Sequence, residues 1–268
     1  PAFRAYYVRP TAHVPLDAAV YIGGGQWRKH VFADEAHWPA SWASMERLKF
    51  FSPDRARIFK FEGLGRFGTE VHQRAQLLGE AGHAPLPLEH ADGFGVYAMV
   101  EGRPLSTSDV SREVLERIAA YCAFRYFEFR PQGRLPADLE TMLRFNVQEE
   151  FGAPVGMDTS FLHTSSPIIA DGRMLPHEWL RTSSGRLLKV DGTTHGDDHF
   201  FPGPTDIAWD LAGTIVEWDL DREAAQFLLE RYQRITGDDP RPRLQPFLLA
   251  YTVFRMGYCK MAAEAMRG

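Results

Sequence analysis

The most informative stretch of the chain is Ile168-Ile-Ala-Asp171-Gly-Arg-Met-Leu-Pro-His-Glu-Trp, in which an aspartate directly follows a short apolar run. The same pattern returns in Leu187-Leu-Lys-Val-Asp191-Gly. A third segment, Thr205-Asp-Ile-Ala-Trp-Asp210-Leu-Ala, then opens an apolar helical pattern. We interpret the first two segments as short strands that end in aspartates, and this series predicts the catalytic part of the chain.

Residues 1–100 show strand and turn patterns with one clear helix, so they predict a β-rich lobe. The apolar run at 18–22 is expected to pair as a hairpin with 26–32. A further strand is expected at 57–61, and Thr69 is the expected N-cap of a helix that ends at Gly79. The Glu-Gly-Arg-Pro cluster at 101–104 marks the boundary of this lobe.

Residues 101–268 are dominated by helical periodicity and predict a second, mainly helical lobe. From Ser111 onward, one face of a helix collects apolar residues at helical spacing and also includes Tyr121, Cys122 and Arg125. We expect this face to be buried. Further helices are expected at 139–149, 207–218, 222–235 and 244–263.

Composition and charge narrow the function classes. The 268 residues are 44% hydrophobic and 24% charged, which is typical of a globular protein. The net charge is −5 and no Lys/Arg run exceeds two residues, so a nucleic-acid partner is not expected. No apolar stretch approaches the ~20 residues that a membrane span requires, and no signal peptide is visible, so we expect a cytoplasmic protein without a membrane partner. Cys122 and Cys259 are expected to be reduced core residues.

The three-part series around Asp171, Asp191 and Asp210 resembles the catalytic block of aminoglycoside phosphotransferases and their choline and homoserine kinase relatives. In that block, a catalytic-loop Asp is followed by an Asn, a strand ends in a metal-binding Asp, and Asp-Leu-Ala opens the next helix. The resemblance implies an α+β, bilobal, protein-kinase-like fold with a small β-rich N-lobe and a larger helical C-lobe.

Upstream segments agree with this resemblance, which covers roughly residues 55 to 220. Arg-Ile-Phe-Lys60-Phe resembles the strand that carries the phosphate-binding lysine, and Glu70 lies where the family's helix carries the glutamate that pairs with it. Residues 96–105 resemble the hinge strand, where the backbone groups of Ala98 and Val100 would hold the adenine ring. The first lobe is therefore expected to bind the nucleotide, and the second to carry catalysis and acceptor binding.

The family roles that the resemblance implies match what phosphoryl transfer needs, which is positioning and charge neutralisation. Asp171 would orient the acceptor hydroxyl and accept its proton. Asp191 would hold Mg²⁺ against the phosphates, because a hard cation prefers oxygen ligands. Lys60, held by Glu70, would place a positive charge on the phosphate oxygens. Asp210 is expected to brace the catalytic loop by accepting backbone N–H bonds.

The chain departs from the family pattern at the catalytic loop. Ile-Ala-Asp171 replaces the usual His-Gly-Asp, and Pro176 occupies the position of the family's Asn. The only asparagine, Asn146, lies well upstream. His177 or Glu178 would therefore supply the second metal contact. Glutamate suits Mg²⁺, whereas histidine would favour a softer divalent ion.

Two further motifs remain open. The cluster Thr193-Thr-His195-Gly-Asp-Asp-His199 can be a metal site, an acceptor contact or a solvated acidic loop. Gly23-Gly-Gly25 can be a phosphate-binding loop or a plain tight turn. Asp171-Gly and Asp191-Gly are also ordinary turn sequences when each is taken alone.

The sequence as a whole predicts an ATP- and Mg²⁺-dependent kinase, with Mn²⁺ as a possible substitute, acting on a hydroxyl group of a small molecule. One alternative is a pseudokinase that binds nucleotide as a regulator. A second alternative is a metal-dependent hydrolase built from His177, Asp191, His195 and His199. The identity of the acceptor and the oligomeric state are left open.

Overall fold

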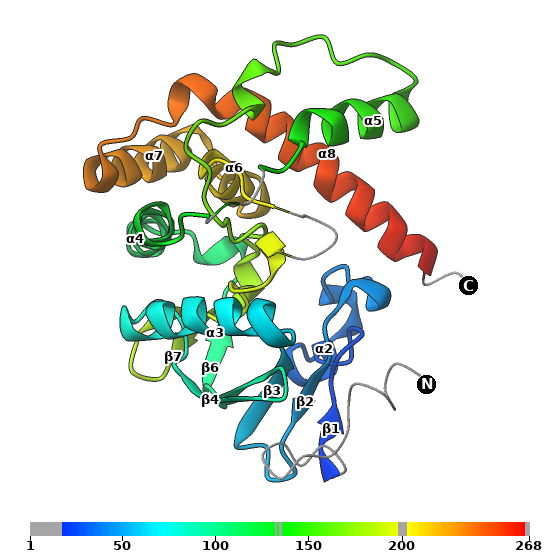
Figure 1. The fold of residues 1–268 in the computed structure, drawn as a ribbon, viewed down its shortest axis with the longest axis vertical. Helices are drawn as coiled ribbons and strands as arrows, with labels where there is room; N and C mark the ends of the chain where they lie inside the picture. The colour runs from blue at the N-terminus through cyan, green and yellow to red at the C-terminus, as the bar shows by residue number, and fades with distance from the viewer. Residues whose placement is uncertain (1–17, 132, 134–135, 198–202, 266–268) are drawn as a thin grey trace. The chain divides into compact units, whose positions relative to one another are not determined.

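The computed structural model describes residues 18–131, 133, 136–197 and 203–265 (Figure 1). The chain forms two compact units. The first comprises residues 18–102 together with 259–265, and the second comprises 103–258. An antiparallel sheet dominates the first unit and helices dominate the second, which confirms the predicted α+β class.

The first unit is built on a five-stranded antiparallel sheet in the order β1-β2-β3-β5-β4. Its strands are β1 (Val20–Tyr21), β2 (Lys49–Phe51), β3 (Arg57–Phe61), β4 (Pro87–Ala91) and β5 (Phe94–Ala98). Phe50, Phe59 and Val96 lie opposite one another on neighbouring strands, and with Phe94 they form a buried cluster. Aromatic and β-branched residues paired in this way stabilise a sheet.

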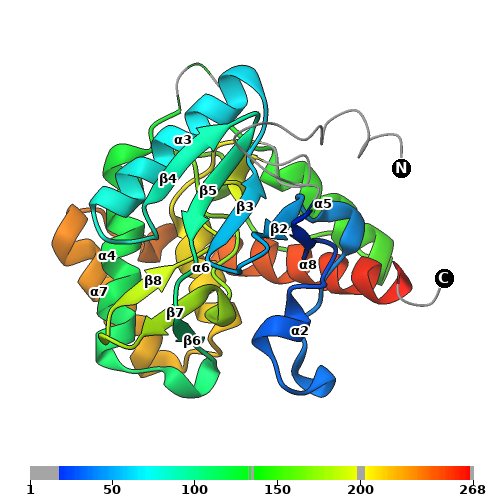
Figure 2. The same cartoon turned by 90° about the horizontal axis from the view of Figure 1, so that it is seen from below.

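Helix α3 (Gly65–Glu80) accompanies this sheet and lies alongside β4 (Figure 2). It begins four residues before Thr69, so the predicted N-cap is wrong; the Thr69 hydroxyl instead donates to the Gly65 carbonyl, at 3.1 Å, within the first turn. Glycines permit the earlier start. Gly63 and Gly65 have φ of +117° and +55°, and a Cβ on Gly68 would lie 2.2 Å from the Gly63 carbonyl oxygen.

The predicted hairpin between 18–22 and 26–32 is also wrong. Strand β1 pairs with β2, and Val20 lies opposite Phe51. The segment after β1 turns on itself through local backbone bonds and forms the short helix α2 (Arg28–Val31), followed by 3₁₀ turns η2 (Glu35–His37) and η3 (Ala43–Met45). Local turn bonds use the backbone groups that a hairpin partner would need.

The second unit is mainly helical. Its long helices are α4 (Arg112–Glu128), α5 (Leu139–Phe151), α6 (Ala208–Glu217), α7 (Arg222–Thr236) and α8 (Arg241–Ala265), whose last residues group with the first unit. Helix α4 packs against α7 (Figure 1). Ser111 caps α4 through a 3.3 Å bond from the Val114 N–H, so the predicted start is confirmed.

Short elements connect these helices. They are β6 (Gly102–Pro104), β7 (Trp179–Thr182) and β8 (Leu187–Lys189), which form a three-stranded sheet, and the 3₁₀ turns η4 (Thr107–Asp109), η5 (Ser160–Leu162), η6 (Pro176–Glu178) and η7 (His195–Asp197). The run at 168–170 is not a full strand; Ile168 forms an isolated antiparallel bridge with Thr205.

Both cysteines are free, as predicted, but only one is a core residue. Cys122 is buried on α4, whereas Cys259 is exposed, so its predicted burial is wrong. It lies on the exposed face of α8, beside the exposed Lys260, whereas Tyr258 and Ala262 lie on the buried face of the same helix. None of the helices that the structure describes is both long enough and apolar enough to cross a membrane.

Candidate active site

The loop that begins at Asp171 is hydrogen-bonded to the first turn of α6. The backbone N–H groups of Asp171 and Gly172 donate to the two carboxylate oxygens of Asp210, at 2.8 and 3.0 Å. Gly172 has a φ of +88°, which favours glycine at this bend. The predicted brace by Asp210 is confirmed.

Two tryptophans complete this anchor. The Trp209 indole N–H donates to the Gly172 carbonyl at 3.1 Å, and the Trp218 indole N–H donates to the Met174 carbonyl at 2.9 Å. Both indoles are fully buried. Because α6 and the residue that follows it supply all of these bonds, the helix fixes the position of the loop.

Helix α4 supplies the next layer around Asp171. The Tyr121 hydroxyl donates to Asp171 Oδ2 at 2.5 Å, and Arg125 Nη1 donates to that hydroxyl oxygen at 2.7 Å. Arg125 also donates to the carbonyls of Gly192 and Ile169, at 2.7 and 3.0 Å. Burial raises the pKa of Tyr121 well above its usual range, so the phenol keeps the proton that it donates. The sequence placed Tyr121 and Arg125 on the buried face but gave them no role; an arginine on an apolar face was the available signal.

Lys189 is a site residue that the sequence interpretation missed. Its Nζ lies 2.7 Å from Glu178 Oε2, 3.3 and 3.4 Å from the two Asp171 oxygens, and 3.1 Å from the Asp191 carbonyl oxygen. The side chain is buried. A lysine inside the apolar run 187–190 was the available signal, because an unpaired charge is costly to bury.

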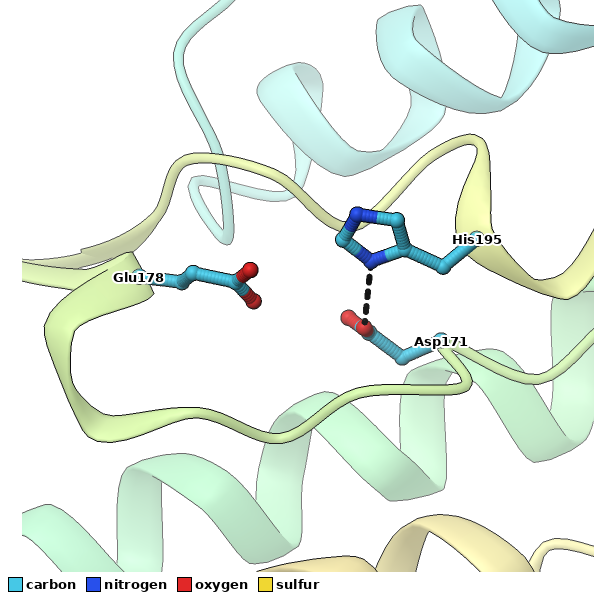
Figure 3. A group of neighbouring side chains, drawn as sticks. All are labelled: Asp171, Glu178 and His195. Atoms are coloured by element: carbon cyan, nitrogen blue, oxygen red, sulfur yellow. Dashed lines mark ion pairs between the residues drawn. The ribbon is translucent and has the colours of Figure 1, made fainter. Parts of the chain in front are cut away.

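His195 lies between two carboxylates. Its Nδ1 is 3.7 Å from Asp171 Oδ1 and its Nε2 is 3.5 Å from Asp191 Oδ2. Within the described residues, Asp171, Glu178 and His195 form a group whose ligand atoms lie within 4.8 Å of one another (Figure 3). His195 is buried, so it is not part of a solvated loop. Asp198 and His199, the rest of the predicted cluster, lie outside the described residues.

The charges around Asp171 and Lys189 keep both of these side chains ionised. Burial alone would raise the pKa of Asp171, but Lys189, His195 and Arg125 outweigh it and lower that pKa. Burial alone would lower the pKa of Lys189, but Asp171 and Glu178 reverse this and raise it. The result is a buried carboxylate and a buried ammonium, each stabilised by the other.

Asp210 experiences the opposite balance. Burial, with a contribution from the negative charge of Asp171, raises its pKa to about 6, although Arg125 and the two backbone N–H donors oppose the shift. Arg125 Nε lies 3.8 Å from Asp210 Oδ2 and Arg125 Nη1 lies 3.9 Å from Asp171 Oδ2, so one guanidinium serves both carboxylates.

A divalent metal ion fits only part of this arrangement. Carboxylate oxygens are the ligands that Mg²⁺ prefers, but the Lys189 ammonium already contacts Asp171 and Glu178. With that ammonium in place, the group of Asp171, Glu178 and His195 does not fit a divalent cation. Asp191, which contacts His195 and keeps some solvent exposure, fits better as a metal ligand. His177 is outside the group, and burial lowers its pKa to about 4.

The residues assigned to the nucleotide lie in the first unit. Lys60 is buried on β3, opposite Lys49 on β2 and Gly95 on β5. Glu70, on α3, pairs with Arg66 at 2.6 Å. Ala98 ends β5, and Val100 lies two residues beyond it. Their roles toward a nucleotide stay predictions.

The triple glycine at 23–25 forms a tight turn. Gly24 and Gly25 have φ of +60° and +79°. The Gly25 N–H donates to the Glu46 carboxylate at 2.8 Å. A backbone donor that already binds a carboxylate is a poor phosphate cradle, so the structure favours the plain-turn interpretation.

Comparisons with known proteins place the fold. The structure is similar to an ethanolamine kinase from Plasmodium vivax, with a TM-score of 0.52 and 10% identity, covering 83% of this chain and 78% of that one. It is also similar to a choline/ethanolamine kinase family protein from Mesorhizobium loti, with a TM-score of 0.50, 15% identity and coverage of 82% and 84%. A macrolide 2′-phosphotransferase type I gives a TM-score of 0.50 and 13% identity, with 82% and 85% covered.

No protein-family model matches the sequence, and no curated protein matches it. Identities this low show the fold alone. The chain has the kinase-like fold of choline and ethanolamine kinases and antibiotic phosphotransferases, and the predicted fold class is thereby confirmed.

Proposed function

We propose that this protein is a phosphotransferase that moves the γ-phosphoryl group of ATP to a hydroxyl group of a small molecule. The observation that carries this proposal is the braced Asp171 loop, in which Asp210 accepts both N–H groups. It lies within a fold that small-molecule kinases share. A fixed carboxylate is what an acceptor hydroxyl needs for its orientation.

The charge state of Asp171 defines its role. Because its pKa is lowered, the carboxylate is a weak base and would mainly orient the hydroxyl that attacks. That suffices for phosphoryl transfer, since the transition state is largely dissociative and the hydroxyl proton leaves late. Tyr121 and Lys189 hold the carboxylate in one orientation, so the acceptor oxygen would meet a preorganised partner.

The nucleotide and its metal ion would be held by residues that the family pattern indicates. Lys60, positioned by Glu70, would place its positive charge on the phosphates, and backbone groups at Ala98 and Val100 would hold the adenine. Asp191 would hold Mg²⁺, or Mn²⁺ in its place. When bound, the ion neutralises phosphate charge that would otherwise oppose attack.

A second candidate function is a nucleotide-binding regulator without phosphoryl transfer. One observation favours it: the Asp171 side chain is fully buried and already engaged by Tyr121 and Lys189. In this function, the network would stabilise the fold rather than receive an acceptor.

Thermal unfolding with ATP and Mg²⁺ is the first test. A ligand present at about 100 times its dissociation constant should stabilise the folded state by about 2.7 kcal/mol. The wild type should show a higher midpoint, and Asp191→Asn and Lys60→Met should lose most of the shift. The exposed Lys29→Met variant is the matched control and should keep it.

Turnover then separates the candidates. Consumption of ATP with any hydroxyl acceptor, lost in Asp171→Asn, supports the kinase. Nucleotide binding without turnover over a broad acceptor panel supports the regulator. Indifference to every nucleotide, together with a large shift by Mn²⁺ or Zn²⁺ alone, would defeat both and favour a metal-dependent hydrolase.

A further inference from the structure

The buried ammonium of Lys189 is surrounded by oxygen atoms of the kinds that also bind divalent cations. Four oxygen atoms lie within 3.4 Å of Nζ: Oε2 of Glu178, both carboxylate oxygens of Asp171 and the carbonyl oxygen of Asp191. Hard divalent cations also collect carboxylate and carbonyl oxygens.

The surroundings are shaped to admit this group. A Cβ on Gly192 would lie 2.2 Å from the Tyr121 hydroxyl oxygen, 2.7 Å from Asp171 Oδ2 and 3.3 Å from Lys189 Cγ. Any larger residue at 192 would displace the Tyr121 hydroxyl or the Asp171 carboxylate. The glycine therefore lets Asp171 keep the orientation in which it meets both Tyr121 and Lys189.

The sequence lacks one expected metal ligand at this same place. The family's Asn is missing, and Glu178 was one of two residues expected to replace it as the second metal contact. In the structure, the Glu178 carboxylate is bound by Lys189 at 2.7 Å. Adding a divalent cation here would place two more positive charges beside a buried ammonium.

We propose that Lys189 is a built-in cation that replaces one of the two metal ions of a kinase site, so that this protein needs at most the single ion held by Asp191. The inference rests on the proposed function for its meaning in phosphoryl transfer. The contacts of the ammonium do not depend on it.

The test counts Mn²⁺ ions bound per chain by electron paramagnetic resonance, with nucleotide-free protein. The wild type should bind at most one ion. Lys189→Met should bind one more, at a Mn²⁺ concentration about a hundredfold below any second binding event in the wild type. Lys29→Met removes an exposed lysine and should match the wild type.

Either of two ion counts would overturn the inference. One is a wild type that already binds two ions per chain, and this measurement needs no variant. The other is a folded Lys189→Met protein whose ion count equals that of the wild type.

Folding of the variant needs its own control, because Lys189→Met leaves Asp171 and Glu178 without their ammonium. Lys189→Met with Glu178→Gln keeps the net charge, and should fold without gaining an ion. If Lys189→Met alone is unfolded, saturating Mn²⁺ should restore its circular dichroism. Failure to do so while the double variant folds would also count against the built-in cation.

These ion counts are independent of turnover. A protein that never consumes ATP, but gains an ion in Lys189→Met, defeats the proposed function and leaves the inference standing. If the wild type transfers phosphate and binds two ions, the proposed function stands and the inference about Lys189 fails.

Discussion

The carboxylate of Glu62 in the first unit and that of Asp171 in the second are both buried, but their surroundings differ. Glu62 accepts a hydrogen bond from the Tyr97 hydroxyl on Oε1, while its Oε2 is buried with no hydrogen-bond partner among the residues that the structure describes. Nearby, His72 and His90 stack with ring centroids 4.9 Å apart. Each of these histidines also has one buried ring nitrogen for which the described part of the chain offers no hydrogen-bond partner.

Asp171, in contrast, is surrounded by donors and cations. Tyr121 donates to it, Lys189 contacts both of its oxygens, and Arg125 and His195 lie within 3.9 and 3.7 Å. The comparison teaches that burial alone does not identify a functional carboxylate. The Asp171 carboxylate is held in one charge state and one orientation, which is the property that catalysis needs.

The largest expected effect comes from breaking this network at its centre. Arg125→Met leaves Asp171 and Asp210 buried without their shared cation, and should lower the free energy of unfolding by about 4 kcal/mol. Urea denaturation measures this loss in the free energy of unfolding. The control is Arg144→Met, which removes a half-exposed arginine from α5 and should cost no more than about 1 kcal/mol. Equal losses in both variants would contradict a special role for Arg125.

A pH effect should come next in size. Burial lowers the pKa of His177 from 6.5 to about 4. Above pH 6.5 the ring is neutral in both the folded and the unfolded chain, so it does not change the free energy of unfolding. As pH falls from 6.5 toward 4, the unfolded chain takes up the proton first, and stability should drop by up to about 3 kcal/mol. Unfolding midpoints over this range should fall less in His177→Gln. If the midpoints of the wild type and His177→Gln fell equally with pH, the predicted role of His177 would be contradicted.

A matched neutralisation tests the comparison directly. Asp171→Asn keeps the shape but removes the negative charge that Lys189 and Arg125 share, and should cost about 2 kcal/mol. The measurement is chemical denaturation at pH 7. A neutral or stabilising result would mean that the cations do not depend on this carboxylate.

The smallest effect is expected from the same change in the first unit. Glu62→Gln keeps an acceptor for Tyr97 and changes a carboxylate whose Oε2 makes no hydrogen bond within the described residues. Stability should change by no more than about 0.5 kcal/mol, measured as for Asp171→Asn. If Glu62→Gln were the more damaging of the two, the contrast between the units would fail.

Local patterns predicted much of the fold. Strand β3 (Arg57–Phe61) and the start of α4 after Ser111 followed from periodicity and capping, which depend on neighbouring residues. The early start of α3 was missed because it depends on backbone angles at Gly63 and Gly65 that the sequence does not display. The turn after β1 was missed because its local bonds competed successfully with a hairpin.

The site was predicted less completely, for a physical reason. Asp171 and Asp210 could be predicted from strand-end and helix-start patterns. The hydrogen bond from the Asp171 backbone N–H to the Asp210 carboxylate was also expected. Lys189 and Arg125 gave only the weaker signal of a charge within an apolar segment, which does not reveal the partners; Arg125 and Gly192 are 67 residues apart. Charge compensation between distant segments becomes visible only once the chain is folded.

The two tryptophans that hold the Asp171 loop have a practical consequence. Trp209 and Trp218 are fully buried, and each indole N–H is bonded to a carbonyl of the loop itself. Indole emission responds to the polarity and hydrogen bonding around the ring. A shift of the loop on ligand binding would therefore change the colour of the protein's own fluorescence, and Trp218→Phe would show how much of the signal comes from that contact. The loop thus carries its own optical reporter.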